Sequence, residues 1–130
     1  MILETTFLID LERELHCGEA GPAQRFLEAQ AGSTLYITST IAGELAAGMS
    51  PGRRTPWEDF LRPFEILPRT VDVCWEYGQA HRYLSANGLL IGANDLWIGA
   101  TALAFDKPVV TRNTCDFGRI PNVRVLDYCG

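Results

Sequence analysis

The chain has 130 residues, a length typical of one domain. Hydrophobic residues make up 47% of it, as in an ordinary globular protein, so extensive disorder is excluded. The formal net charge of −5 excludes a basic coat of the kind that holds nucleic acids tightly and without sequence preference. It does not exclude an enzyme of nucleic acids, because a cluster of acidic metal ligands would itself raise the acidic count.

The sequence gives no sign of export or of a membrane span. Its first ten residues lack the basic start of a signal peptide and contain two acids. No apolar run reaches the roughly 18 residues that a membrane helix needs. None of the four cysteines belongs to a C-x-x-C pair, so we expect reduced thiols. These features predict a cytoplasmic protein that does not bind membranes.

Short strands and helices alternate along the chain. Apolar and β-branched runs predict the strands, and apolar stripes at helical spacing predict the helices. In chain order the expected elements are a strand at 1–3, helices at 6–15 and from 22, a strand at 34–38, a helix from 39 or 40 to 47, a loop at 48–55, a helix at 57–61, a strand at 64–67, helices at 70–87 and from 94 or 95 to 105, and strands at 109–111 and 123–126.

The alternation predicts an α/β fold with a mainly parallel five-stranded sheet and helices on both faces. Polar side chains at three of the helix starts are the expected caps: Thr5 or Thr6, Ser39 or Thr40, and Asn94 or Asp95. The expected inner face of the longest helix consists of Val71, Cys74, Trp75, Gly78, His81, Tyr83 and Leu84.

Four acids occupy positions that such a sheet would bring to one edge. Glu4 ends the first strand, and Asp116 follows the fourth strand through a loop. Asp95 opens a helix whose start lies at the carboxyl edge of the strands, and Glu44 can lean back from inside its helix toward the same edge. Ligands of open α/β sheets bind at that edge. Each acid alone could instead cap a helix, form a turn or face solvent.

Taken together, the four carboxylates indicate a cation site. Two unit charges about 4 Å apart repel by roughly 4 kcal/mol at an effective dielectric near 20, so unpaired acids would oppose folding or take up protons. Mg²⁺ or Mn²⁺ would remove that penalty, and one or two such ions could activate a water for attack on a phosphodiester. We therefore predict metal-assisted cleavage, with Glu4, Glu44, Asp95 and Asp116 binding the ion directly or through water.

Small polar residues stand next to these acids. A hydroxyl or an amide there could hold a metal-bound water or a phosphate oxygen. The same residues could equally be helix caps and turn formers. The candidates are Thr5, Thr6, Thr111 and Asn113.

Four segments resemble the PIN-domain family, especially the VapC-like ribonuclease toxins of bacterial type II toxin–antitoxin pairs. They are ILETTFLID at 2–10, IAGEL at 41–45, GANDLWIGA at 92–100 and VTRNTCDF at 110–117, and the resemblance covers nearly the whole chain. By position, Glu44, Asp95 and Asp116 match family acids, and Thr111 and Asn113 match the polar pair before the last acid.

The resemblance implies a three-layer α/β/α sandwich that forms one domain over residues 1–130. It also implies Mg²⁺- or Mn²⁺-dependent endoribonuclease activity, homodimerisation and neutralisation by a cognate antitoxin protein. The antitoxin could lay a helix in an apolar groove between the early helices and insert a basic side chain among the acids.

One position departs from the family pattern, which has Asp at the end of the first strand, where this chain has Glu4. The extra methylene moves the carboxylate by ~1.5 Å, and Mg²⁺ demands near-ideal geometry. Glu4 could therefore weaken the site, and we predict that Glu4→Asp keeps or raises cleavage. The alternative function is a catalytically weak module that binds RNA or a protein through the same cleft.

Arginines are the expected RNA contacts. Arg53 and Arg54 lie in the predicted loop with Gly and Pro neighbours, and Arg112 precedes Asn113. Raising the salt concentration should weaken binding that depends on phosphate contacts. Other chemistries lack their signatures: the histidines and cysteines do not have the spacing of a structural zinc site, and Walker and G-x-S-x-G patterns are missing.

Overall fold

The computed structural model describes residues 1–48 and 52–130. In these residues five strands form one all-parallel sheet in the order β3-β2-β1-β4-β5, so the predicted α/β fold with a parallel sheet is confirmed. The strands are β1 (Ile2–Leu3), β2 (Tyr36–Thr38), β3 (Glu65–Leu67), β4 (Val109–Val110) and β5 (Val125–Leu126).

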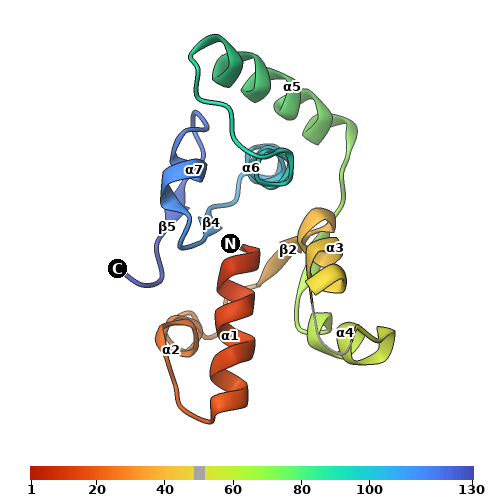
Figure 1. Cartoon of the computed structure of the whole chain (residues 1–130), viewed down its shortest axis with the longest axis vertical. Helices are drawn as coiled ribbons and strands as arrows, with labels where there is room; N and C mark the ends of the chain where they lie inside the picture. Colours follow the sequence, from red (N-terminus) through yellow and green to blue (C-terminus); the bar gives the residue numbers. More distant parts are fainter. Residues whose placement is uncertain (49–51) are drawn as a thin grey trace.

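Seven helices connect the strands within the described ranges. Figure 1 shows α5 and α6 toward one end of the molecule and α1, α2 and α4 toward the other, with the sheet between them. The helices are α1 (Thr5–Cys17), α2 (Pro22–Ala29), α3 (Ser39–Gly48), α4 (Arg54–Leu61), α5 (Val71–Ala86), α6 (Ala93–Phe105) and α7 (Thr114–Gly118).

The centre of the sheet is β1, which pairs with β2 on one side and β4 on the other. Ile2 and Leu3 are fully buried, as expected for a strand covered on both faces. Leu3 is in register with Val110. The residues that follow these two, Glu4 and Thr111, therefore leave the sheet side by side at its carboxyl edge.

The hydrophobic core contains the sheet and the inner faces of the helices. Phe7, Leu84, Ile98 and Phe117 are among its fully buried side chains. Helix α6 is apolar on several sides and buries six of its residues, which is typical of a helix enclosed by neighbours. Its start is thereby fixed relative to the strand ends, which is important for the acid in its first turn.

Several predicted boundaries are wrong. The helix predicted at 57–61 begins earlier, at Arg54, and Gly48 belongs to α3. The predicted loop at 48–55 is thus reduced, and its residues 49–51 lie outside the described part. The segment after β4 was expected to be a loop, but it contains the short helix α7, which carries Asp116.

The predicted caps also need correction. Helix α1 is capped by Glu4, whose carboxylate accepts the N–H of Thr6. At the start of α3, the hydroxyl of Thr38 accepts the N–H of Ile41 at 3.1 Å. Gly92 precedes α6, so Asn94 and Asp95 lie inside the helix. β1 and β2 end at Leu3 and Thr38 as predicted, and the capping side chains are the residue directly after β1 and the last residue of β2.

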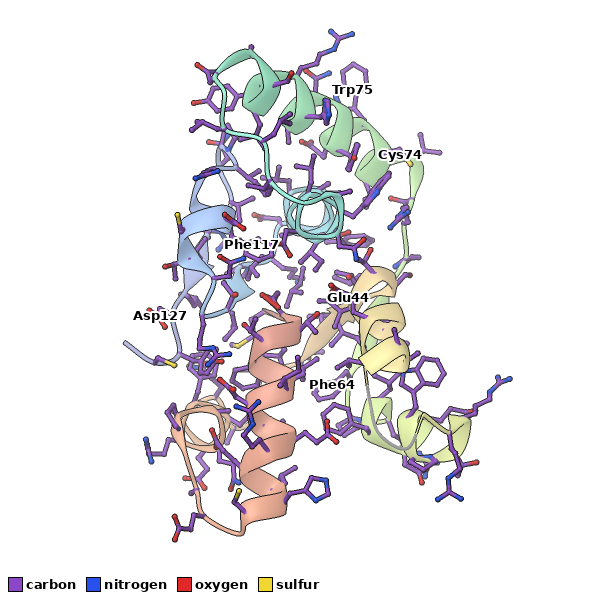
Figure 2. The ribbon with its side chains drawn as sticks, viewed as in Figure 1. Glu44, Phe64, Cys74, Trp75, Phe117 and Asp127 are labelled. Carbon is purple, nitrogen blue, oxygen red and sulfur yellow. The ribbon has the colours of Figure 1, made fainter. Side chains whose placement is uncertain are left out.

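The predicted inner face of α5 is confirmed for Leu84 and wrong for most of the other residues. Its buried residues are Val73, Ala80 and Leu84, whereas the side chains of Val71 and Trp75 are 85% and 67% exposed. Packing against α6 buries the side of the helix that carries Val73, Ala80 and Leu84. Figure 2 shows Cys74 and Trp75 on this helix at the edge of the molecule.

Two further properties concern the surface. Among the described residues, all four cysteines are free and exposed. None of the helices in the described ranges combines the length and the apolar composition that a membrane span requires.

Candidate active site

Glu4 is the most buried of the four predicted acids, with 3% of its surface exposed. Its Oε2 accepts the N–H of Thr6 at 2.5 Å, and its Oε1 accepts the hydroxyl of Thr111 at 2.8 Å and that of Thr6 at 3.3 Å. The carboxylate is therefore held by donors from the start of α1 and from the end of β4. Thr5 and Thr6 are thus not caps but supports of the acids.

Glu44 comes to the same place from α3. Its Oε1 accepts the hydroxyl of Thr5 at 2.7 Å, which ties the third helix to the start of the first across 39 residues of sequence. Figure 2 shows Glu44 on the side of α3 that faces the start of α1. The predicted convergence of these two elements is therefore present in the structure.

Asn113 joins the other two acids. Its amide Nδ2 lies 3.3 Å from Oδ2 of Asp95, in the first turn of α6, and 3.2 Å from Oδ2 of Asp116, in α7. The backbone N–H of Asn113 donates to the hydroxyl of Thr111 at 2.9 Å, and Thr111 in turn donates to Glu4. One polar network therefore links three of the acids.

The acids affect one another electrostatically. Burial raises the pKa of Glu4; hydrogen bonds from Thr6 and Thr111 lower it in part, and the charges of Asp95 and Glu44 raise it further. Burial also raises the pKa of Asp95, followed by the charges of Glu44 and Asp116. In the part of the chain that the structure describes, none of the four acids forms an ion pair with a lysine, arginine or histidine.

The donor set fits a hydrated divalent cation. Among residues 1–48 and 52–130, no three His, Cys, Asp or Glu side chains converge closely enough to bind one ion directly. The oxygens of Glu4 face Thr6 and Thr111. The amide of Asn113 lies between the carboxylates of Asp95 and Asp116. Mg²⁺ is usually held by one or two carboxylates and keeps several waters. Uncompensated carboxylates with free lone pairs suit that mode of binding.

Arg112, one of the predicted RNA contacts, lies next to this network. Its backbone N–H donates to the hydroxyl of Thr6 at 3.3 Å, and its Nε lies 3.3 Å from Oδ2 of Asp10. The hydroxyl of Tyr128 donates to the same Asp10 oxygen at 2.5 Å. The C-terminal segment thus fixes an arginine beside the acids.

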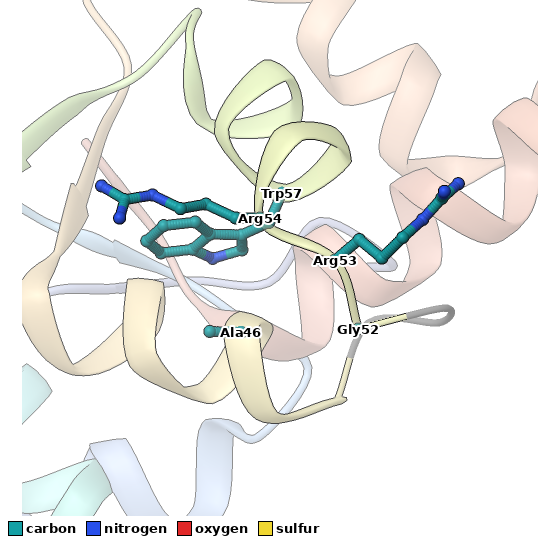
Figure 3. A pocket seen from close by; sticks show the side chains of 5 residues that line it. All are labelled: Ala46, Gly52, Arg53, Arg54 and Trp57. Carbon is teal, nitrogen blue, oxygen red and sulfur yellow. The ribbon is translucent and has the colours of Figure 1, made fainter.

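Arg53 and Arg54 lie elsewhere. They line a hollow of about 240 Å³ together with Ala46, Gly52 and Trp57, and none of the four acids is among these lining residues. Figure 3 shows Arg54 extending over the Trp57 ring and Arg53 pointing the opposite way. Arg54 is the first residue of α4 and pairs with Glu58 at 2.6 Å. The structure therefore does not bring these two arginines into contact with the acids.

Sequence reasoning missed three residues near the site. Asp10 stands one helical turn after Thr6 on α1, a spacing that could have identified it. Tyr128 and Arg69 lie in segments without a periodic pattern, and only the folded chain brings Tyr128 to Asp10 and Arg69 to Thr40.

Comparison with known proteins identifies the family. The family model of the PIN domain matches residues 1–122. This chain belongs to the PIN-domain family. The four acids, the threonines and Asn113 all lie in the matched part of this PIN domain.

Relatives and solved structures agree with the assignment. Ribonuclease VapC2 of Rickettsia felis is 33% identical over 96 residues, which cover 70% of this chain and 72% of the relative. Ribonuclease VapC1 of Haemophilus influenzae is 33% identical over 113 residues, which cover 82% and 83%. A chain in the crystal structure of VapBC2 from Rickettsia felis bound to a DNA fragment from their promoter superposes with a TM-score of 0.81 at 28% identity, covering 96% of both chains. The three-layer α/β/α architecture of such PIN domains is the one found here.

Proposed function

We propose that this PIN domain is a divalent-metal-dependent endoribonuclease and the toxin of a toxin–antitoxin pair. The observation that carries the proposal is the cluster of Glu4, Glu44, Asp95 and Asp116, joined by hydroxyl and amide donors and not paired with any cation in the described residues. The names of its relatives, which are ribonucleases, support RNA as the substrate.

Asp95 and Asp116 are the acids that we assign to a Mg²⁺ or Mn²⁺ ion, with Glu4 and Glu44 acting directly or through water. When bound, such an ion supplies positive charge that neutralises the phosphate and promotes ionisation of a nearby water. Asn113 restrains both aspartates through its amide. Thr5, Thr6 and Thr111 keep the two glutamates turned toward the same space.

The proton of the attacking water needs an acceptor. Burial raises the pKa values of Glu4 and Asp95 in the metal-free protein, and a bound cation would oppose that rise. Glu4 is enclosed by its donors, whereas Asp95 is only partly buried, so a water can reach it. In the proposed reaction the water oxygen forms a bond to phosphorus in line with the departing nucleotide, and the proton of the water passes to a carboxylate oxygen of the cluster that does not hold the cation. The P–O bond to the departing nucleotide breaks, its electron pair stays on that oxygen, and the oxygen takes up a proton from solvent.

Arginines supply the proposed RNA contacts. Arg112 uses its Nε on Asp10, and the rest of its guanidinium can donate to a phosphate beside the acids. Arg53 and Arg54, at the hollow beside Trp57, are proposed as contacts for a more distant part of the RNA.

Protein partners have candidate surfaces of their own. A hollow of about 400 Å³ beside α4 is lined in part by Trp57, Leu61, Phe64 and Ile66. These apolar side chains, with Arg54, Glu58 and Arg62 also in the lining, support the proposal that an amphipathic helix of the antitoxin binds there. The exposed side chains of Val71 and Trp75 on α5 support the proposed homodimer through a separate surface.

The test is cleavage of bulk transfer RNA by the purified protein, with Mn²⁺ and with EDTA. We expect Mn²⁺-dependent cleavage that is lost in Asp95→Asn and Glu44→Gln. Glu28→Gln is the matched control, because this acid is exposed on α2. Binding of RNA without turnover at any Mn²⁺ concentration would support the binding module instead of the enzyme.

A further inference from the structure

Arg69 lies between β3 and α5 and is held in place by two uncharged groups. Its Nη2 donates to the hydroxyl of Thr40 on α3 at 2.9 Å. Its guanidinium carbon lies 3.8 Å from the ring centroid of Trp97 on α6, a cation–π contact. Tyr77 of α5 stacks on the same indole with 3.9 Å between the ring centroids. The arginine is therefore fixed by contacts with two helices.

Both helices carry acids of the active site. Thr40 precedes Glu44 by four residues on α3, so the two side chains lie on one face, a helical turn apart. Trp97 follows Asp95 by two residues on α6, so the indole projects from a different side of the helix. Arg69 consequently lies beside the acid cluster and not within it, at the junction of α3 and α6.

The charge of Arg69 is not compensated by an acid in the described residues. Five other arginines pair with carboxylates there: Arg13, Arg54, Arg62, Arg112 and Arg124. The contacts of Arg69 are a hydroxyl and an indole face, and neither neutralises a positive charge. The side chain is also exposed. An exposed, oriented and uncompensated guanidinium is prepared to bind an anion.

We propose that Arg69 is a phosphate-binding residue of the RNA site and contacts a backbone phosphate next to the bond that the acids attack. This inference rests on the proposed ribonuclease function. A strand of RNA that approaches a cluster of carboxylates is repelled by them, and a fixed cation at the rim offsets that repulsion. The planar guanidinium offers paired N–H groups that match two phosphate oxygens, and its stack on Trp97 lowers the entropy lost on binding.

The salt dependence of RNA binding tests the proposal. Affinity of the full chain for fluorescently labelled bulk transfer RNA is measured over a series of KCl concentrations, with EDTA present to prevent cleavage. The slope of log affinity against log salt reports the number of phosphates neutralised and changes by about 0.7 to 0.9 for each contact. We expect Arg69→Ala to reduce the slope by that amount.

Two further variants complete the design. Arg25→Ala is the matched control, because Arg25 is exposed on α2 and its Nη1 is held by the neutral carbonyl of Ala20. It should leave the slope unchanged. Arg69→Lys keeps the charge but not the planar fork, so it should retain the slope with weaker binding, and it guards against a folding defect in the alanine variant. With Mn²⁺ present, Arg69→Ala should raise KM and leave kcat unchanged.

Three results would overturn the assignment. They are an equal slope and equal affinity for Arg69→Ala and the wild type, an equal slope with weaker binding, which would indicate base stacking or a purely structural role, and the same slope change in Arg25→Ala. The two proposals fail separately. Cleavage by the wild type with an unaffected slope in Arg69→Ala would reject only the phosphate contact, and a reduced slope without any cleavage would reject only the ribonuclease.

Discussion

Asp95→Asn should stabilise the metal-free protein at neutral pH although it abolishes cleavage. Asp95 and Asp116 share the amide of Asn113, and the two contacts of 3.3 Å and 3.2 Å limit the distance between their Oδ2 atoms to about 6.5 Å. At that separation two unit charges repel by about 2.5 kcal/mol at an effective dielectric near 20. The amide of Asn has the same shape as the carboxylate, and its oxygen can still accept from Asn113.

Two effects reduce this gain. Both aspartates are only partly buried, so solvent screens their repulsion. Asp95 also lies in the first turn of α6, where a negative charge is stabilised by about 0.3 to 1 kcal/mol. The net stabilisation expected is about 1 kcal/mol, which corresponds to a rise in Tm of about 3 to 5 °C for a chain of this length.

The stabilisation should depend on pH. Burial, Glu44 and Asp116 raise the pKa of Asp95 in the folded state. Below the pKa of the unfolded chain, Asp95 is protonated in both states, so the wild type and Asp95→Asn should then be equally stable. As the pH rises through the folded pKa, the wild type loses stability relative to the variant. The difference in Tm should therefore grow from acidic to neutral pH.

Thermal unfolding followed by circular dichroism, with EDTA, provides the measurement. Asp72→Asn is the matched control, because Asp72 lies in the first turn of α5 and is exposed. It should be neutral or slightly destabilising. Mn²⁺ should raise the Tm of the wild type more than that of Asp95→Asn. If the Tm of Asp95→Asn in EDTA at neutral pH is no higher than that of Asp72→Asn, the acids do not repel one another. The electrostatic argument for a cation site then fails.

Three other substitutions test the site and its supports. Glu4→Asp should keep or raise Mn²⁺-dependent cleavage of RNA, because the family pattern has Asp at this position. Stability should fall by about 1 to 2 kcal/mol from the lost methylene and hydrogen bond, although Asp is a good helix cap. Lost cleavage would contradict the assignment of Glu4. Glu14→Gln should lower the stability to urea by about 1 kcal/mol at neutral pH, because the carboxylate accepts three N–H groups at the start of α2. Burial would raise the pKa of Glu14, but these hydrogen bonds hold it below its usual value, so the difference should vanish as the pH falls through it; a constant difference would refute the role of its charge. Tyr128→Phe should cost about 1 to 2 kcal/mol in the same urea assay through the lost bond to Asp10, and an unchanged midpoint would show that this bond contributes nothing.

Much of the fold is determined by local sequence. The strands read as apolar runs, Pro22 starts a helix as predicted, and alternating elements require parallel strands. Parallel strands place their carboxyl ends at one edge, so the sequence predicts Glu4 and Thr111 at the same edge, whereas their contact also requires the pairing of β1 with β4. The family resemblance likewise rests on short segments whose spacing is visible in the sequence, and the match to the PIN domain confirms it.

Other features depended on contacts between residues far apart in the chain. In helix α5, only packing against α6 decides that Val73 is buried and Trp75 exposed. The amide of Asn113 lies between two carboxylates because α6 and α7 meet there. Arg69 stands in a segment without periodicity, and its contacts with Thr40 and Trp97 come from separate helices. Local sequence sets backbone preferences and the direction of the strands, whereas the pairing of side chains is fixed only when the helices pack.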